Sequence, residues 1–153
     1  MEIPWTSVLK GKVVLLGIGN ILRGDDGFGP YLMARLEGRV GAICIDAGTA
    51  PENYLGRISR ENPDTVLLAD AVHLDLSPGH YALLKKEDIV RSGLTTHTLS
   101  PHLFMECLQS RTTATIYLLG VQPQTTAFCE ELSEPMQKAI TQLAADIQEA
   151  LHA

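Results

Sequence analysis

Short runs of apolar residues alternate along the chain with segments of mixed character. Four of these runs are continuous enough to predict strands that are buried on both faces of a sheet. They are Val13–Ile18, Ala42–Asp46, Thr65–Asp70 and Thr115–Gly120. A fifth extended segment, His80–Lys85, follows the turn-forming sequence Ser77-Pro78-Gly79 and predicts an edge strand.

Helical spacing of apolar residues separates these runs. In the C-terminal segment, Ser133 is a suitable N-cap and Pro135 stands in the first turn. Apolar side chains then recur at helical intervals, at Met136, Ile140, Leu143, Ile147 and Leu151. Shorter helices are predicted at Pro30–Glu37 and at about residues 100–109.

This alternation of strands and helices predicts the fold class. Strands joined by helices form mostly parallel sheets with helices on both faces. We therefore expect an α/β protein, a three-layer α/β/α sandwich whose twisted, mostly parallel sheet has about five strands. A single domain of the phosphorylase-like or hydrolase-like kind should cover residues 1–153. In such sheets, ligands bind beyond the carboxyl ends of the strands.

The composition excludes several classes of protein. With 45% hydrophobic and 20% charged residues, the chain suits one globular domain. Its apolar runs are far shorter than the roughly 20 residues that cross a bilayer, so we expect no membrane partner. The net charge of −6 and the scattered lysines and arginines argue against nucleic acid. The three cysteines, Cys44, Cys107 and Cys129, are widely spaced, which predicts reduced thiols, a cytoplasmic location and no cysteine zinc site.

Carboxylates stand where three of the predicted strands end. The first strand leads into Gly24-Asp25-Asp26-Gly27, the second ends at Asp46 and the third ends at Asp70. We expect these groups to meet on one rim, because the carboxyl ends of parallel strands share an edge. Each aspartate alone fits the cap of a helix or turn. Asp26 and Asp70 together, with a histidine such as His97 in a polar loop, indicate a site.

Nucleotide-binding motifs are absent from the sequence. Gly17-Ile18-Gly19 would need a third glycine at position 22, which is Leu22, and Asp25 and Asp26 would repel a pyrophosphate. The chain also lacks a Walker A lysine, a nucleophile elbow and a His-Glu-x-x-His helix.

Several sequence blocks, in order along the chain, resemble the hydrogenase maturation endopeptidase family. The signature block is Gly19–Gly29, which reads GNILRGDDGFG. The further blocks are Asp46–Asn53, Leu68–Ala71, Thr95–His97 and Gly120–Pro123. Together they extend from about Val13 to the final helix. Many family members carry glutamate in place of Asp26, and aspartate there resembles the branch that serves formate-hydrogenlyase-type hydrogenases.

The resemblance implies a function and a set of site residues. Asp26, Asp70 and His97 would form the catalytic, metal-contacting triad. The positions implied to bind substrate or to position the site are Asn20, Asp46 and Gly48. The activity implied is that of an endopeptidase that removes the C-terminal extension of a nickel–iron hydrogenase large-subunit precursor after nickel insertion. That precursor is the expected partner, and we expect the protein to be a monomer.

Two carboxylates and an imidazole, without a thiolate, should hold nickel only modestly. We therefore expect no tightly bound resident cofactor and a nickel ion supplied by the substrate as the recognition element. Two mechanisms stay open: the metal polarises the scissile carbonyl or a water, or it only docks the tail while a carboxylate activates an unligated water. A cysteine nucleophile is disfavoured. The same α/β/α layout also occurs in nucleoside phosphorylases and aminopeptidases, so the fold alone does not determine an activity. The alternative function is a non-catalytic nickel-sensing chaperone that binds the precursor.

Overall fold

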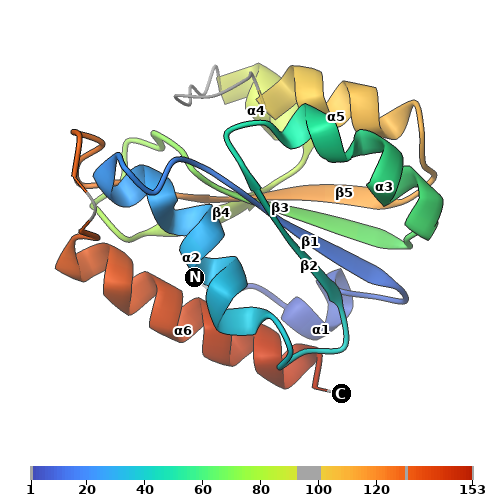
Figure 1. The fold of residues 1–153 in the computed structure, drawn as a ribbon, viewed down its shortest axis with the longest axis horizontal. Coiled ribbons are helices and arrows are strands. Elements are labelled where there is room, and N and C mark those ends of the chain that lie inside the picture. The colour runs from blue at the N-terminus through green and yellow to red at the C-terminus, as the bar shows by residue number, and fades with distance from the viewer. Residues whose placement is uncertain (1, 93–100, 130, 153) are drawn as a thin grey trace.

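The computed structural model describes residues 2–92, 101–129 and 131–152 (Figure 1). The strands are β1 (Val13–Ile18), β2 (Ile43–Gly48), β3 (Thr65–Ala71), β4 (Tyr81–Leu84) and β5 (Thr115–Val121). The α-helices are α1 (Trp5–Val8), α2 (Phe28–Leu36), α3 (Leu55–Glu61), α4 (Lys86–Ser92), α5 (Pro101–Gln109) and α6 (Glu134–Ala150). Two short 3-10 helices are η1 (Gly24–Gly27) and η2 (Pro51–Tyr54).

The strands form one five-stranded sheet in the order β2-β1-β3-β5-β4. All neighbours are parallel except β4, which pairs antiparallel with β5 at the edge. Every residue of β1 and β3 is buried, as expected for the central strands of a sheet that is covered on both faces. The predicted mostly parallel sheet with an added edge strand is confirmed.

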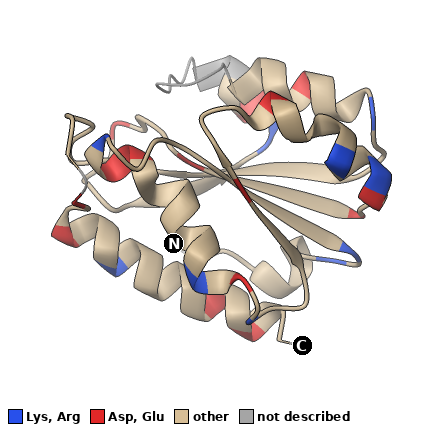
Figure 2. Ribbon diagram, in the orientation of Figure 1, with Lys and Arg blue, Asp and Glu red and all other residues tan. Residues whose placement is uncertain are grey.

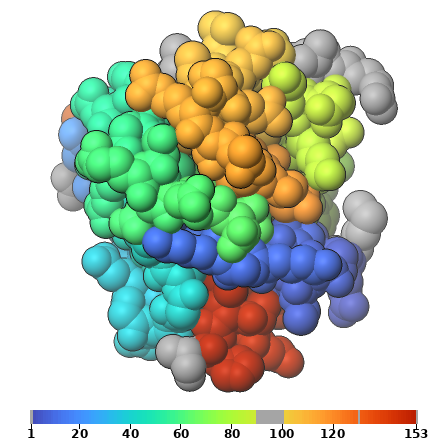
Figure 3. Space-filling view, turned by 90° about the vertical axis from the view of Figure 1, so that its right-hand side faces the viewer, coloured from blue at the N-terminus to red at the C-terminus, as the bar shows by residue number. Residues whose placement is uncertain are grey.

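Helices cover both faces of the sheet. In Figure 1, α2 and α6 lie below the strands, and α3, α4 and α5 lie above them. Figure 3 views the molecule from the right-hand side and shows the same two layers, cyan and red below, green and orange above. Alternate residues of β1 enter different cores: Leu15 packs with α2 and α6, whereas Val14 and Leu16 pack with α3 and α5. The predicted three-layer sandwich is confirmed.

The start of α2 and several short helices differ from the predictions. Helix α2 begins at Phe28, two residues before the predicted start at Pro30, because η1 continues directly into it. Ser133 is the N-cap of α6, as predicted, and its Oγ accepts a hydrogen bond from the Met136 N–H at 3.4 Å. The sequence pattern did not indicate α1, α3, α4 or the two 3-10 helices, which are too short to show a clear helical period.

Charged side chains are dispersed over the surface. Figure 2 shows lysine and arginine on helices and loops of both layers, without a continuous basic stripe in the residues that are described. Over the same residues, no helix is long and apolar enough to cross a membrane.

Candidate active site at the carboxyl edge of the sheet

The two buried aspartates of the predicted triad lie at the same edge of the sheet. Asp26 is in η1, directly after β1, and Asp70 is near the end of β3. Strands β1 and β3 pair in parallel, and Gly17 lies opposite Ala69, the residue before Asp70. Asp26 and Asp70 are 1% and 2% exposed. This edge, formed by the carboxyl ends of the parallel strands, is at the left of the sheet in Figure 1.

Glycines allow the segment that carries Asp26 to pack against the strand ends. A Cβ atom at Gly29 would overlap the carbonyl oxygens of Ala69 and Ile18, so only glycine lets the start of α2 lie this close to β1 and β3. Gly19 has a φ of +147°, and a side chain there would collide with the carbonyl oxygen of Asp26. The glycines of the signature block therefore bring η1 against the end of β1.

The two oxygens of the Asp26 carboxylate differ in their hydrogen bonds to the described residues. Oδ2 accepts a hydrogen bond from the backbone N–H of Asn20 at 2.9 Å. Oδ1 is buried, and it accepts no hydrogen bond from the residues that the structure describes. A buried carboxylate oxygen without a donor is costly, and such atoms are concentrated at positions retained for function. Asp26 is thus fixed in place through Oδ2, and its role in a site stays a prediction.

The neighbouring Asp25 has a different role, which the sequence did not reveal. This side chain is fully buried, and both of its oxygens accept hydrogen bonds. Oδ1 accepts from the Ser133 N–H at 2.8 Å. Oδ2 accepts from the Gln124 N–H at 2.8 Å and from the Ser133 hydroxyl at 2.7 Å. Asp25 therefore joins the signature loop to the segment between β5 and α6.

Gln122 braces the loop that follows Asp70. Its Oε1 accepts a hydrogen bond from the Leu74 N–H at 2.6 Å, and its carbonyl oxygen accepts one from the Gly79 N–H at 2.9 Å. Gln122 belongs to the Gly120–Pro123 block, to which the sequence assigned no role. The segment after β5 thus holds the loops that follow β1 and β3, one through Asp25 and the other through Gln122.

Two of the three predicted substrate-binding residues make local turn contacts, and the third links two strand ends. The Oδ1 of Asn20 accepts a hydrogen bond from the Leu22 N–H at 2.9 Å. Asp46 is exposed on β2, and its Oδ1 accepts from the Gly48 N–H at 3.0 Å. Gly48 has a φ of +56°, and its carbonyl oxygen accepts from the Gly19 N–H at 2.8 Å. The contact of Asp46 matches the alternative of an aspartate that caps a turn, and the role of all three residues in substrate binding stays a prediction.

The metal-contacting triad also stays a prediction. His97 lies outside the described residues. In the ranges 2–92, 101–129 and 131–152, no three histidine, cysteine, aspartate or glutamate side chains come together in a way that could hold a metal ion. The two aspartates of the proposed triad lie at one edge of the sheet.

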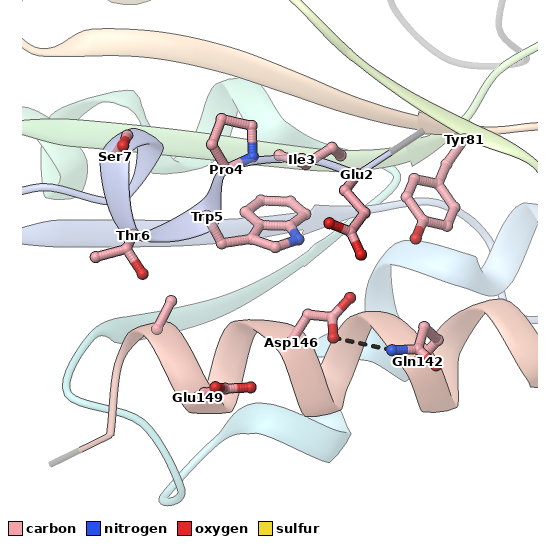
Figure 4. A pocket seen from close by; sticks show the side chains of 11 residues that line it. Glu2, Ile3, Pro4, Trp5, Thr6, Ser7, Tyr81, Gln142, Asp146 and Glu149 are labelled. Carbon is pink, nitrogen blue, oxygen red and sulfur yellow. Dashed lines mark hydrogen bonds between the residues drawn. The ribbon is translucent and has the colours of Figure 1, made fainter.

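A hollow of about 700 Å³ lies on the α6 face of the sheet, between the N-terminal segment, Tyr81 and α6 (Figure 4). None of the predicted site residues lines it. Burial raises the pKa of Tyr81, and the nearby carboxylates Asp146 and Glu2 raise it further. Because the hollow is separate from Asp26 and Asp70, we do not assign the chemistry to it.

The three cysteines lie in different environments, and that of Cys44 disfavours a thiolate. Cys44 is on β2, where burial raises the pKa of its thiol to about 11, with a smaller contribution from Glu37. Cys107 and Cys129 are exposed.

We expect iodoacetamide at pH 8 to alkylate Cys107 and Cys129 well before Cys44, because only the thiolate reacts and almost none forms at Cys44. Peptide mass spectrometry of timed samples measures the order of modification. In guanidinium chloride the protein unfolds and Cys44 is no longer buried, so the three thiols should react with iodoacetamide at similar rates. Alkylation of Cys44 as fast as Cys107 in the folded protein would show that the buried environment of Cys44 is wrong.

Comparisons with known proteins identify the family. The family model described as hydrogenase maturation protease matches residues 30–150. The hydrogenase 3 maturation protease of Escherichia coli K12 is 32% identical over 130 residues, covering 83% of each chain. The crystal structure of a nickel–iron hydrogenase maturation protease from Thermococcus kodakarensis KOD1 superposes with a TM-score of 0.87 at 32% identity, covering 95% of this chain and 97% of that one. A crystal structure of the hydrogenase 3 maturation protease gives a TM-score of 0.80 at 28% identity, covering 91% and 90%. With its fold and most of its length matched in this way, the chain belongs to the hydrogenase maturation protease family.

Proposed function

We propose that this protein is an endopeptidase that removes the C-terminal extension of a nickel–iron hydrogenase large-subunit precursor once nickel has been inserted. Membership of the family supports the class of reaction. The observation that carries the site is Asp26, whose Oδ1 is buried at the carboxyl edge of the sheet without a hydrogen-bond donor among the described residues. The proposed partner is the precursor, and the proposed state and location are a monomer in the cytoplasm.

In this proposal, the nickel ion arrives with the substrate. Asp26, Asp70 and His97 would complete the coordination of an ion that the precursor already holds. Carboxylate oxygens and an imidazole nitrogen are ligands that nickel accepts, and without thiolates they would not remove the ion from its own site. A precursor without nickel would lack these contacts and would be rejected. We therefore assign no resident cofactor to the protein.

For the cleavage step, a water molecule would attack the scissile carbonyl. A carboxylate at this edge, Asp26 or Asp70, would take the proton from the water and later return it to the leaving amine. We favour a role for the substrate's ion in polarising the carbonyl or the water over a role in docking alone. Asn20, Asp46 and Gly48 would bind the substrate chain or position the loops around it.

The proposal predicts cleavage that depends on nickel in the substrate. Purified enzyme should shorten nickel-loaded precursor and leave nickel-free precursor intact, while elemental analysis finds no stoichiometric metal in the resting enzyme. His97→Ala should lower the rate by about 10²–10⁴-fold. His152→Ala is a matched control, because His152 is exposed after α6 and should not affect cleavage. Intact-mass spectrometry of the precursor measures the loss of the tail.

Two outcomes would contradict this proposal. Equal cutting of nickel-free precursor, or a tightly held metal in the resting enzyme, would overturn nickel gating. Binding of the nickel-loaded precursor without any shortening would favour the non-catalytic chaperone.

A further inference from the structure

Large apolar side chains are exposed at the same edge of the sheet as Asp26. Five large apolar side chains are exposed among the described residues: Ile21, Leu22, Leu76, Leu103 and Phe128. All five lie on segments that adjoin the carboxyl ends of the strands, since Leu103 is in the first turn of α5 and the others are in loops that leave β1, β3 and β5. Phe128 is the most exposed, at 80%. Grouped exposed apolar side chains commonly mark interaction surfaces.

Three of these side chains belong to two loops that are bonded to each other. We call Ile21, Leu22 and Phe128 the apolar tip; they are 46%, 39% and 80% exposed. The Cys129 N–H donates to the Leu22 carbonyl oxygen at 2.8 Å, and Arg23 pairs in parallel with Cys129. This pairing makes Leu22 and Phe128 neighbours across the two loops. The apolar tip is therefore one surface built from residues that are about a hundred positions apart in the sequence.

Backbone hydrogen bonds between the loops that follow β1 and β5 fix the backbone that carries the apolar tip. The Gly24 N–H donates to the Cys129 carbonyl oxygen at 2.6 Å, and the Asp25 N–H donates to the Thr125 carbonyl oxygen at 2.9 Å. The buried Asp25 carboxylate adds its bonds to Gln124 and Ser133. The loops are thus tied to the body of the protein on both sides of Phe128. An apolar side chain that is held exposed by a braced backbone is positioned for a partner.

The size and position of the apolar tip indicate what covers it. Three such side chains remove at most about 600 Å² when fully covered, which is less than the roughly 800 Å² per partner of a stable protein interface. The surface is thus too small for a second copy of this chain and suits a short segment. It adjoins Asp26, because Asn20, which donates its N–H to Asp26, directly precedes Ile21.

We propose that the apolar tip binds a short, uncharged apolar stretch of the precursor protein next to the bond that is cut. This inference rests on the proposed function, since it takes the precursor as substrate. Ile21, Leu22 and Phe128 carry no charge, so the stretch they contact is apolar. The apolar tip anchors that stretch and thereby sets the peptide bond beside Asp26.

Phe128→Ser tests the proposal, with cleavage kinetics and calorimetric binding both measured on the nickel-loaded precursor. We expect KM and Kd to rise about 10- to 100-fold, as for the loss of a buried phenylalanine contact, with kcat within about twofold of the wild type. Leu22→Ser should act in the same direction, and Phe128→Leu should restore most of the affinity. The matched control is Leu103→Ser, because Leu103 is 51% exposed but lies on α5, outside the apolar tip. The melting temperature should not change, since Phe128 contributes little to the core.

The possible results separate this inference from the proposed function. If the wild type cuts the precursor and Phe128→Ser and Leu22→Ser leave KM and Kd unchanged, the apolar tip is not the binding surface, although the endopeptidase stands. If the wild type binds the precursor without cutting it and Phe128→Ser weakens that binding, the proposed endopeptidase activity is wrong. The proposed binding role of the apolar tip is then still supported. A wild type that neither cuts nor binds overturns both. Equal weakening by Leu103→Ser, or a wild-type dimer that Phe128→Ser dissociates, also contradicts the proposal.

Discussion

Asp26→Asn is expected to slow cleavage by orders of magnitude without weakening the fold. The amide keeps the shape of the carboxylate, and its oxygen can still accept the hydrogen bond from the Asn20 N–H. It lacks the negative charge that attracts a cation and the basicity that takes a proton from water. Loss of a general base lowers kcat by about 10²–10⁴-fold. Removing a buried charge whose Oδ1 has no donor among the described residues should leave the free energy of unfolding unchanged or raise it.

Two measurements on Asp26→Asn check this expectation. Single-turnover cleavage of nickel-loaded precursor gives the loss of rate, and urea unfolding gives the change in stability. Asp64→Asn is the control, because Asp64 is exposed and directly precedes β3, at the opposite end of the strands from Asp26. A rate for Asp26→Asn within tenfold of the wild type would exclude Asp26 from the chemistry. A fall in stability would instead assign Asp26 a structural role.

The adjacent substitution, Asp25→Asn, should have the opposite profile and chiefly destabilise the protein. The carboxylate of Asp25 accepts three hydrogen bonds through two oxygens, and an amide can present an acceptor at only one of these positions. The amide NH₂ would therefore face a backbone N–H or the Ser133 hydroxyl, which leaves buried donors unsatisfied. We expect the free energy of unfolding to fall by about 3 kcal/mol, and the melting temperature to fall by about 6–12 °C.

Chemical unfolding of Asp25→Asn beside the wild type measures this loss. The matched control is Asp64→Asn, because Asp64 is exposed and its Oδ2 accepts one bond, from the Lys12 N–H at 2.7 Å. That control should cost less than about 1.5 kcal/mol. Residual cleavage by the folded fraction of Asp25→Asn is expected, since Asp25 acts through the loop that carries Asp26. Equal stabilities of Asp25→Asn and the wild type would show that the link to Ser133 contributes nothing.

The sequence predicted the sheet well because burial there is strongly patterned. Strands β1 and β3 are buried at every position, and this produces the continuous apolar runs that identify central strands. Helix α6 was equally clear, because its apolar residues recur over several turns after Ser133. The short helix α3 depends on packing of Ile58 into the core and not on a periodic pattern, so local sequence did not indicate it.

The site was predictable only in part. Asp26 and Asp70 could be proposed from strand ends and from resemblance, and both are at the expected edge. Nothing local distinguishes Asp25 from Asp26, because the difference comes from partners that are 99 and 108 residues away in the sequence. The sequence did indicate Ser133 as the N-cap of α6. Its hydroxyl and its N–H also donate hydrogen bonds to the Asp25 carboxylate. His97 lies outside the described residues, so its role stays a prediction.

The long-range link between Asp25 and Ser133 has a consequence for the order in which the parts of the protein fold. A contact between residues 108 positions apart forms late, because the ends of a long stretch of chain must first be brought together. During synthesis, Ser133 leaves the ribosome well after the loop that carries Asp25 and Asp26, because it is 108 positions later in the chain than Asp25. The loop that carries Asp26 is therefore not braced through Asp25 until Ser133 and the start of α6 have docked. A chain cut before Gln124 would lack all three hydrogen bonds to the Asp25 carboxylate, and the loop that carries Asp26 would lose this brace.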